Sequence, residues 1–386
     1  MGVIWEPALD ATARDWQAKA ARLSREQFAP LAEELDREQR YPWESIPKLV
    51  DSGLAGLFLP REHGGQGASL TATVAVVERI AEDCASTAAI LCAYQLGAFP
   101  LLLAGTDAQK AFYLKAMAEG TATSFALSER SAGSDPAAMQ ATGEEEGDGW
   151  RLRGEKFWIG NGGASRYYVT FVKTDPEAGG RGITAFMVDK EAEGVAVDHL
   201  SDKMGIRGTQ TSNLRLDTLV PAGAQVGERG RALRLALKTL NVGRIMVAAQ
   251  SLGLAIGAFR EAAPRAVTRK TFGQAIIENQ GISFPLADVA TEITAARLLL
   301  YQAAEAYDRG EDVQIIGAQA KLYCSLVAHK AADVAMQVWA GDGYCKPSKV
   351  ERLYRDQRIL EIYEGTSEIQ RLVLGRAIRS EVEKPT

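Results

Sequence analysis

The stretch IGAQAKLYCSLVAHKAADVAMQV, residues 316–338, has the repeat of a long helix with one apolar face. Its apolar residues recur at steps of three and four: Ile316, Ala320, Tyr323, Val327, Ala331, Val334 and Val338. A second stripe with the same spacing precedes it: Leu286, Val289, Ile293, Ala296 and Leu300. Two such stripes in neighbouring segments predict antiparallel helices that bury their apolar faces against each other. We expect this helical bundle to occupy residues 230–386.

The residues before the bundle fall into two segments of different character. Residues 123–229 contain short β-prone runs such as Tyr167–Val172 and Ile183–Val188, separated by turns rich in Gly and Asp. Residues 1–122 are rich in Ala, Leu and Glu and have a helical pattern, which breaks at a turn cluster, His63–Gly67, and at Pro100. The chain therefore predicts a helical domain, a small β domain and a helical bundle, in that order.

Length and composition exclude several classes of protein. A chain of 386 residues is long enough for two or three domains, and 46% hydrophobic with 24% charged residues is typical of a globular protein. The net charge of −5 is spread without long runs, so we expect no nucleic-acid partner. The four Cys and three His residues lack the spacing of a metal site or a disulfide framework.

The N-terminal residues and the most apolar stretch bear on location. Met1–Pro7 has neither the basic start and apolar run of a signal peptide nor a myristoylation pattern, so we expect a cytoplasmic protein. Residues 88–105 approach membrane-spanning length, but Gln95, Gly97 and Pro100 interrupt them. We interpret this stretch as two buried helical pieces and expect no membrane-spanning segment.

Four short runs of polar, aromatic or charged residues beside turns are candidates for a catalytic or ligand-binding site. Phe125–Asp135 leaves a strand and enters a turn whose N–H and hydroxyl donors suit phosphates or carbonyl oxygens, although an ordinary polar loop has the same composition. Glu155–Gly163 ends a strand with Trp158 beside an Asn-Gly turn, so the indole either stacks on a planar cofactor or anchors the core. Thr268–Gln274 is either a cationic helix end capped by Gly273 or an Arg directed at a phosphate.

The fourth run, Ile362–Gln370, combines a helix start with an acid. Ser367 and Gln370 satisfy the capping-box rule, which predicts that a helix begins here. Glu364 lies just outside that helix, beside a glycine. Such a carboxylate is either a solvated acid near the positive end of a helix dipole or, in apolar company, a general base with a raised pKa.

Taken together, the order and spacing of these runs resemble the acyl-CoA dehydrogenase family of flavoproteins. The resemblance extends along nearly the whole chain through four further runs: Leu59–Gly67, Lys203–Gly208, Gly317–Lys321 and Gln337–Tyr344. It implies a mainly α fold with a middle β domain: an N-terminal helical domain, a small β-barrel-like domain and a C-terminal four-helix bundle. These expectations agree with the pattern of domains at 1–122, 123–229 and 230–386.

The resemblance implies FAD as the cofactor. One set of residues would line the flavin and its phosphates or pack near its ring: Phe125, Leu127, Ser128, Gly133, Ser134, Trp158, Ile159, Gly160, Thr366 and Glu368. A second set would hold the pyrophosphate and adenosine end across a subunit interface: Arg269, Phe272, Gln280, Gln337 and Gly341. A homo-oligomer, usually a tetramer, follows by analogy.

The resemblance also implies a reaction and its residues. Glu364 matches the catalytic base, which abstracts the α-proton of a saturated acyl thioester while flavin N5 takes the β-hydride, giving the trans-2-enoyl thioester. The substrate would contact Ser134, Asn241, Arg244, Tyr363 and Gly365. We expect a short- to medium-chain acyl-CoA as the substrate and an electron-transfer flavoprotein as the electron acceptor.

Three departures from the family pattern keep alternatives open. Gly160 stands where the family usually has a Thr near flavin N5, Arg130-Ser131 replaces the commoner Pro-Gly, and Asn241 replaces an Asp near the pantetheine arm. These changes motivate a second hypothesis, in which the acyl group rides on an acyl- or peptidyl-carrier protein. A flavin oxygenase is a third hypothesis, against which Glu364 counts. An idle binding subunit is a fourth, disfavoured because the base and cofactor positions are retained.

Overall fold

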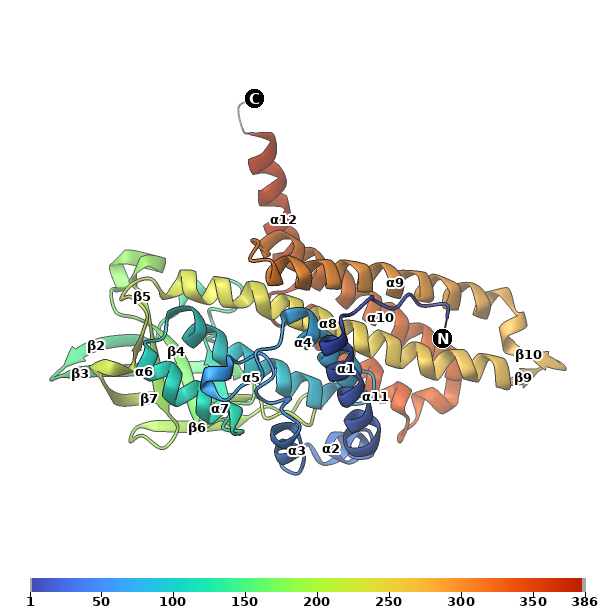
Figure 1. Ribbon diagram of the computed structural model, residues 1–386, viewed down its shortest axis with the longest axis horizontal. Coiled ribbons are helices and arrows are strands. Elements are labelled where there is room, and N and C mark those ends of the chain that lie inside the picture. Colours follow the sequence, from blue (N-terminus) through green and yellow to red (C-terminus); the bar gives the residue numbers. More distant parts are fainter. Residues whose placement is uncertain (1, 384–386) are drawn as a thin grey trace.

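The computed structural model describes residues 2–383, and it places the β domain at one end of an elongated helical body (Figure 1). Seven helices precede the β domain: α1 (Ala11–Leu23), α2 (Ala32–Glu38), α3 (Ser45–Asp51), α4 (Leu70–Ala81), α5 (Ala85–Ala104), α6 (Asp107–Gln109) and α7 (Lys115–Ala118). Five follow it: α8 (Ala232–Thr268), α9 (Gln280–Asp308), α10 (Gln314–Tyr344), α11 (Lys349–Gln357) and α12 (Ser367–Val382). A short hairpin of β9 (Lys270–Thr271) and β10 (Gln274–Ala275) joins α8 to α9.

The β domain is one eight-stranded, mostly antiparallel sheet. Its strands are β1 (Thr123–Ala126), β2 (Thr142–Glu146), β3 (Gly149–Ile159), β4 (Tyr167–Lys173), β5 (Ile183–Asp189), β6 (Val195–Leu200), β7 (Ser212–Pro221) and β8 (Gln225–Val226). The order is β6-β7-β3-β2-β4-β5-β8, and β1 pairs in parallel with β4, Thr123 opposite Tyr167. The two runs expected to be strands are β4 and β5, which pair antiparallel and are mostly buried.

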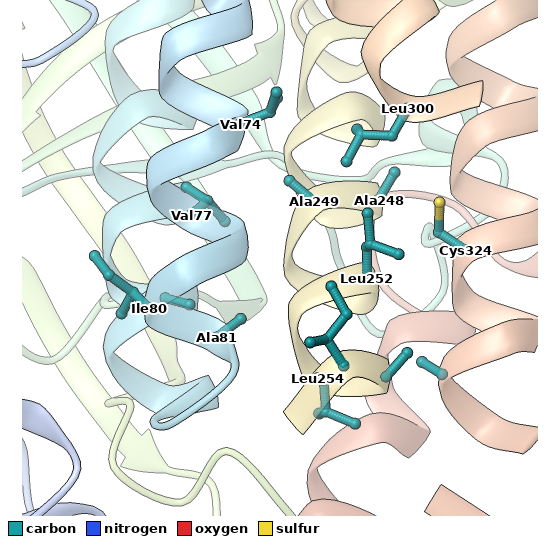
Figure 2. Packing of buried hydrophobic residues seen from close by; sticks show 14 of the residues in the cluster. Val74, Val77, Ile80, Ala81, Ala248, Ala249, Leu252, Leu254, Leu300 and Cys324 are labelled. Carbon is teal, nitrogen blue, oxygen red and sulfur yellow. The ribbon is translucent and has the colours of Figure 1, made fainter. Parts of the chain in front are cut away.

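The bundle and the N-terminal domain share one hydrophobic core around α8 (Figure 2). On one side, Val74 and Val77 of α4 face α8. On the other side, Leu300 of α9 and Cys324 of α10 pack against it. Every residue of the stripe expected on α9 is buried, so the helical periodicity was a correct guide to the core. The fold class expected from the sequence is confirmed.

The expectation that residues 88–105 form two helical pieces is wrong. They belong to α5, a single helix of 20 residues with Pro100 inside it. Pro100 lies near the end of α5, where its missing N–H removes one main-chain hydrogen bond without ending the helix. Gly97 serves packing, not termination. A Cβ atom at Gly97 would lie 2.1 Å from the main-chain oxygen of Thr123, so the glycine lets α5 touch β1.

Two helices, α5 and α8, are long and apolar enough to cross a membrane. In this structure, 67% and 100% of their respective apolar windows are buried inside the protein. Core helices of globular proteins have the same composition, so the apolar character of α5 and α8 is explained by the shared core.

Gly97→Ala tests the close contact between α5 and β1. The added methyl group must displace a strand main chain, so we expect the free energy of unfolding to fall by about 1–3 kcal/mol. Gly375→Ala is the matched control, because Gly375 lies within α12 and nothing in the chain lies within 4 Å of a Cβ built there. We expect the control to be neutral or slightly stabilising. Denaturant unfolding of both variants decides, and equal stability would contradict the packing role of Gly97.

Candidate active site

The loop before α12 holds the candidate base in an unusual backbone conformation. Glu364 has φ +54° and Gly365 has φ +89°, both in the left-handed region. A left-handed residue other than glycine costs roughly 1–2 kcal/mol, so surrounding contacts must hold the turn. Gln370 of α12 supplies two of them, because its side-chain Nε2 donates to the Gly365 oxygen at 2.8 Å and to the Glu364 oxygen at 3.3 Å.

The helix start differs by one residue from the expectation. The N-cap of α12 is Thr366, whose hydroxyl accepts a hydrogen bond from the Ile369 N–H at 3.3 Å. Ser367, the predicted cap, is the first helical residue and its hydroxyl is buried. The predicted capping box is therefore wrong, because Gln370 turns back to the carbonyls of the Glu364–Gly365 turn and not to the N-cap.

The Glu364 carboxyl lies in a narrow space against α8 and α5. Its Oε2 atom is buried and has no hydrogen-bond partner among the described residues. A Cβ atom on Gly243 would lie 2.7 Å from this oxygen and 3.1 Å from Leu96, so only a glycine leaves room here. Burial raises the pKa of Glu364 to about 7, while the charges of Arg244 and Lys321 act in the opposite direction.

Arg244 and Tyr363, both predicted to contact substrate, flank this carboxyl. Arg244 is buried on α8, and its Nη1 donates to Asn241 Oδ1 at 3.0 Å. Burial lowers the pKa of Arg244, and the Glu364 charge opposes that change. The Tyr363 hydroxyl donates to the side chain of Gln250, and burial raises the Tyr363 pKa well above its ordinary value. Glu364 is therefore the group of this cluster suited to accept a proton near neutral pH.

The predicted flavin residues from Phe125 to Gly160 gather at one corner of the β domain, whereas Thr366 and Glu368 lie at the start of α12, beside the loop of Glu364. The Phe157 N–H donates to the Ser128 oxygen at 2.9 Å, and the Ser124 hydroxyl donates to the Gly160 oxygen at 2.6 Å. The turn after β1 and the end of β3 are thus tied together. Some of the predicted residues here are buried or partly buried, Phe125, Leu127, Ser128 and Ile159, and others are exposed, Gly133, Ser134, Trp158 and Gly160.

The α5 helix connects this corner to the base. A Cβ atom on Gly160 would lie 3.8 Å from Ala93, and Leu96 lies one turn further along α5, beside Gly243 and Glu364. Cys92, on the same helix, donates to the Met246 oxygen of α8 with an S···O distance of 3.8 Å. The corner of the β domain and the base loop therefore face a common region along α5.

The second set of predicted cofactor residues lies elsewhere. Arg269 follows the end of α8, Phe272 is fully exposed in the β9–β10 turn, and Gln280 begins α9. Gln337 and Gly341 are exposed near the end of α10, next to a kink at Ala340. The distance along α8 from Gly243 to Thr268 is about 38 Å at 1.5 Å per residue. Within one chain, this set is therefore far from Glu364.

The end of α8 differs from the expectation for the third run, Thr268–Gln274, in which Gly273 would cap the helix. The helix ends at Thr268, four residues before the positive-φ pair Phe272 and Gly273. Gly273 therefore serves the hairpin turn between β9 and β10 and does not cap α8.

The sequence analysis did not assign three residues that contact Glu364 or hold its turn: Gly243, Lys321 and Gln370. Lys321 was only part of a family run, yet a lysine beside the apolar stripe of a buried helix was a signal for a buried charge. Gln370 was noticed as a capping residue. Gly243 had no signal of its own, because its role depends on a loop 121 residues later.

Family models match all three parts of the chain. The acyl-CoA dehydrogenase N-terminal domain matches residues 10–121, the middle domain 124–219 and the C-terminal domain 230–379. The chain is 42% identical over 359 residues to probable acyl-CoA dehydrogenase FadE25 of Mycobacterium tuberculosis, covering 92% of each protein. It is 41% identical over 361 residues to a 3-(aryl)acrylate reductase of Clostridium sporogenes, covering 92% of this chain and 96% of that one.

A solved structure shows the same architecture. Butyryl-CoA dehydrogenase from Megasphaera elsdenii superimposes with a TM-score of 0.94 at 36% identity, covering 97% of this chain and all of the other. The order of domains, the loop acid and these matches agree. The chain belongs to the acyl-CoA dehydrogenase family and is an oxidoreductase of that family.

Proposed function

We propose that this enzyme dehydrogenates a short- to medium-chain saturated acyl-CoA to the trans-2-enoyl-CoA, with Glu364 as the base that removes the α-proton. The observation that carries this proposal is the buried carboxyl of Glu364, which has an oxygen without a partner and a pKa raised to about 7. A thioester α-proton is weakly acidic, so its removal needs a base held close to it in a site that excludes water. The similarity to butyryl-CoA dehydrogenase supports a short acyl chain.

The backbone of the base loop would assist this step. Among the described residues, the main-chain N–H groups of Glu364 and Gly365 make no hydrogen bond to the chain. Removing the α-proton moves negative charge onto the thioester carbonyl oxygen. A free N–H directed at that oxygen would stabilise the charge as it develops, and the left-handed turn exposes such groups.

The corner of the β domain fits FAD. The Ser128 and Ser134 hydroxyls make no hydrogen bond within the described chain, and a Cβ on Gly133 would meet no atom within 4 Å, so the turn is open and rich in donors. The side chain of Trp158, next to this turn, is 55% exposed, so its indole ring is available to a planar cofactor. Leu127, Ile159 and Gly160 would complete the ring site. When bound there, FAD supplies the acceptor for the β-hydride.

The remote set of cofactor residues supports a homo-oligomer, which we propose to be a tetramer. Arg269, Phe272 and Gln280 are too far from Glu364 to contact the same cofactor in one chain. They are exposed, so a second subunit can bring them to the site. The α12 helix projects from the body of the molecule (Figure 1) and exposes Leu372, Ile378 and Val382, as expected for a subunit contact.

An anaerobic titration tests the substrate class. FAD-loaded protein is mixed with acyl-CoAs of different length and branching, and with a 3-arylpropionyl-CoA because of the aryl-acrylate relative. We expect short and medium chains to bleach the oxidised flavin band. A flavin that stays oxidised with every acyl-CoA would contradict the proposal. The same titration with acyl groups on a carrier protein would then test the alternative carrier.

Glu364→Gln tests the base, because it keeps the shape of the side chain while removing its ability to take a proton. We expect normal folding and FAD content, with kcat reduced by about 10³-fold or more. In the wild type, kcat/KM should fall as the pH drops through about 7, since protonated Glu364 cannot accept a proton. Wild-type turnover of the Gln variant would place the base elsewhere.

A further inference from the structure

Lys321 is a buried charge that the proposed mechanism has not yet used. It lies in the first third of α10 and is fully buried. Its ammonium donates to the main-chain oxygen of Gly365 at 2.8 Å, and none of the ion pairs among the described residues includes Lys321. A buried ammonium without an ion pair is costly, so such a group is retained where its charge or its hydrogen bond is needed.

The hydrogen bond of Lys321 falls on the turn that carries the base. The Gly365 oxygen receives two donors, Lys321 from α10 and Gln370 from α12. Together they fix the peptide between Gly365 and Thr366, and Gln370 also donates to the Glu364 oxygen of the preceding peptide. Both residues of this turn are left-handed. The direction of the Glu364 side chain therefore depends on a helix from the bundle.

The titratable groups around Glu364 come from three helices and from its own loop. Arg244 faces it from α8 and Lys321 from α10, and both favour the carboxylate. Cys92 on α5 and Tyr363 in the loop also face it, and burial raises the pKa of both, so they stay neutral near pH 7. Burial lowers the pKa of Lys321 to about 8, with Glu364 acting against that change, so Lys321 is mostly charged at pH 7.

We propose that Lys321 is a positioning residue for the base: its ammonium fixes the Glu364–Gly365 turn through the Gly365 oxygen, and its charge favours ionised Glu364. The inference rests on the proposed role of Glu364. Arg244 differs from Lys321, since its guanidinium is also bonded to Asn241, on the side expected to meet the substrate. Lys321 donates its hydrogen bond to the turn itself, so it acts through the turn and through its charge.

The test compares Lys321→Met, which removes donor and charge, with Lys321→Gln, which removes the charge but keeps a donor. Lys330→Met is the control, because Lys330 lies on the same helix but is partly exposed and paired with Glu292 at 2.7 Å. For each FAD-loaded variant, kcat/KM is measured from pH 5.5 to 9.5 with the acyl-CoA that bleaches the wild type best. FAD content and thermal unfolding are recorded in parallel.

We expect both Lys321 variants to move the acid limb of kcat/KM upward by about one pH unit, because losing a nearby positive charge disfavours the carboxylate. At pH 7 this corresponds to about fivefold lower kcat/KM, and the deficit should shrink toward pH 9.5. Lys321→Met should also unfold at a lower temperature than Lys321→Gln, since it removes the hydrogen bond as well. The control should keep the wild-type limb.

A merely structural role predicts a different result. The variants would then lose stability or FAD while the active fraction kept the wild-type limb, and that outcome would overturn the inference. Failure of both Lys321 variants to give FAD-loaded protein would also overturn it, by assigning the residue to folding. If Glu364→Gln is inactive while the Lys321 variants keep the wild-type pH dependence of kcat/KM on the acid side, only this inference fails. If Glu364→Gln is active, the proposed function fails first.

Discussion

The structure depends on the burial of α8, a helix of 37 residues that packs against both the N-terminal domain and the bundle. Close packing requires small residues on it. A Cβ at Gly253 would lie 2.1 Å from the main-chain oxygen of Glu78, on α4. A Cβ at Gly257 would lie 2.4 Å from the main-chain oxygen of Glu82, just after α4. Glycine within a helix costs about 1 kcal/mol relative to alanine, so these positions exchange helix stability for contact between domains.

The same constraint produces the site. Gly243 lies ten residues before Gly253 on α8. Its missing side chain leaves room for the Glu364 carboxyl, just as the missing side chain of Gly253 leaves room for the backbone of α4. Because the helix is buried, the carboxyl placed against it is buried too, and its pKa rises to about 7. Arg244 and Lys321 limit that rise in pKa, so the Glu364 carboxyl can still ionise near neutral pH. The packing that joins the domains therefore also sets the chemistry of the loop acid.

The sequence predicted what depends on local pattern. The stripe from Leu286 to Leu300 identified the core face of α9, and alternating β-prone runs identified β4 and β5. It missed what depends on contacts between distant segments. Pro100 and Gly97 looked like helix breaks because nothing local reveals that α5 packs on β1. The capping-box rule predicts Ser367 as the cap because Gln370 follows three residues later, but α12 is capped by Thr366 and the Gln370 amide holds the turn before it.

The roles in the site divide in the same way. The resemblance of the loop motif to the family pattern predicts Glu364 as the base, whereas Gly243 and Lys321 matter only once α8, α10 and the loop meet. Cofactor residues that lie near each other in sequence, such as Ser128 and Ser134, could be grouped in advance. The set around Arg269 has a meaning for the site only if a second subunit supplies it, which no single-chain pattern can show.

The most direct measurement is a titration of the Glu364 carboxyl itself. Infrared difference spectra of FAD-loaded protein with and without Glu364→Gln isolate the protonated carboxyl band of this residue as the pH is raised. We expect that band to disappear with a midpoint near pH 7, because burial disfavours the carboxylate. A midpoint near the ordinary glutamate value of about 4.3 would show a solvated acid and contradict a base tuned by burial against α8.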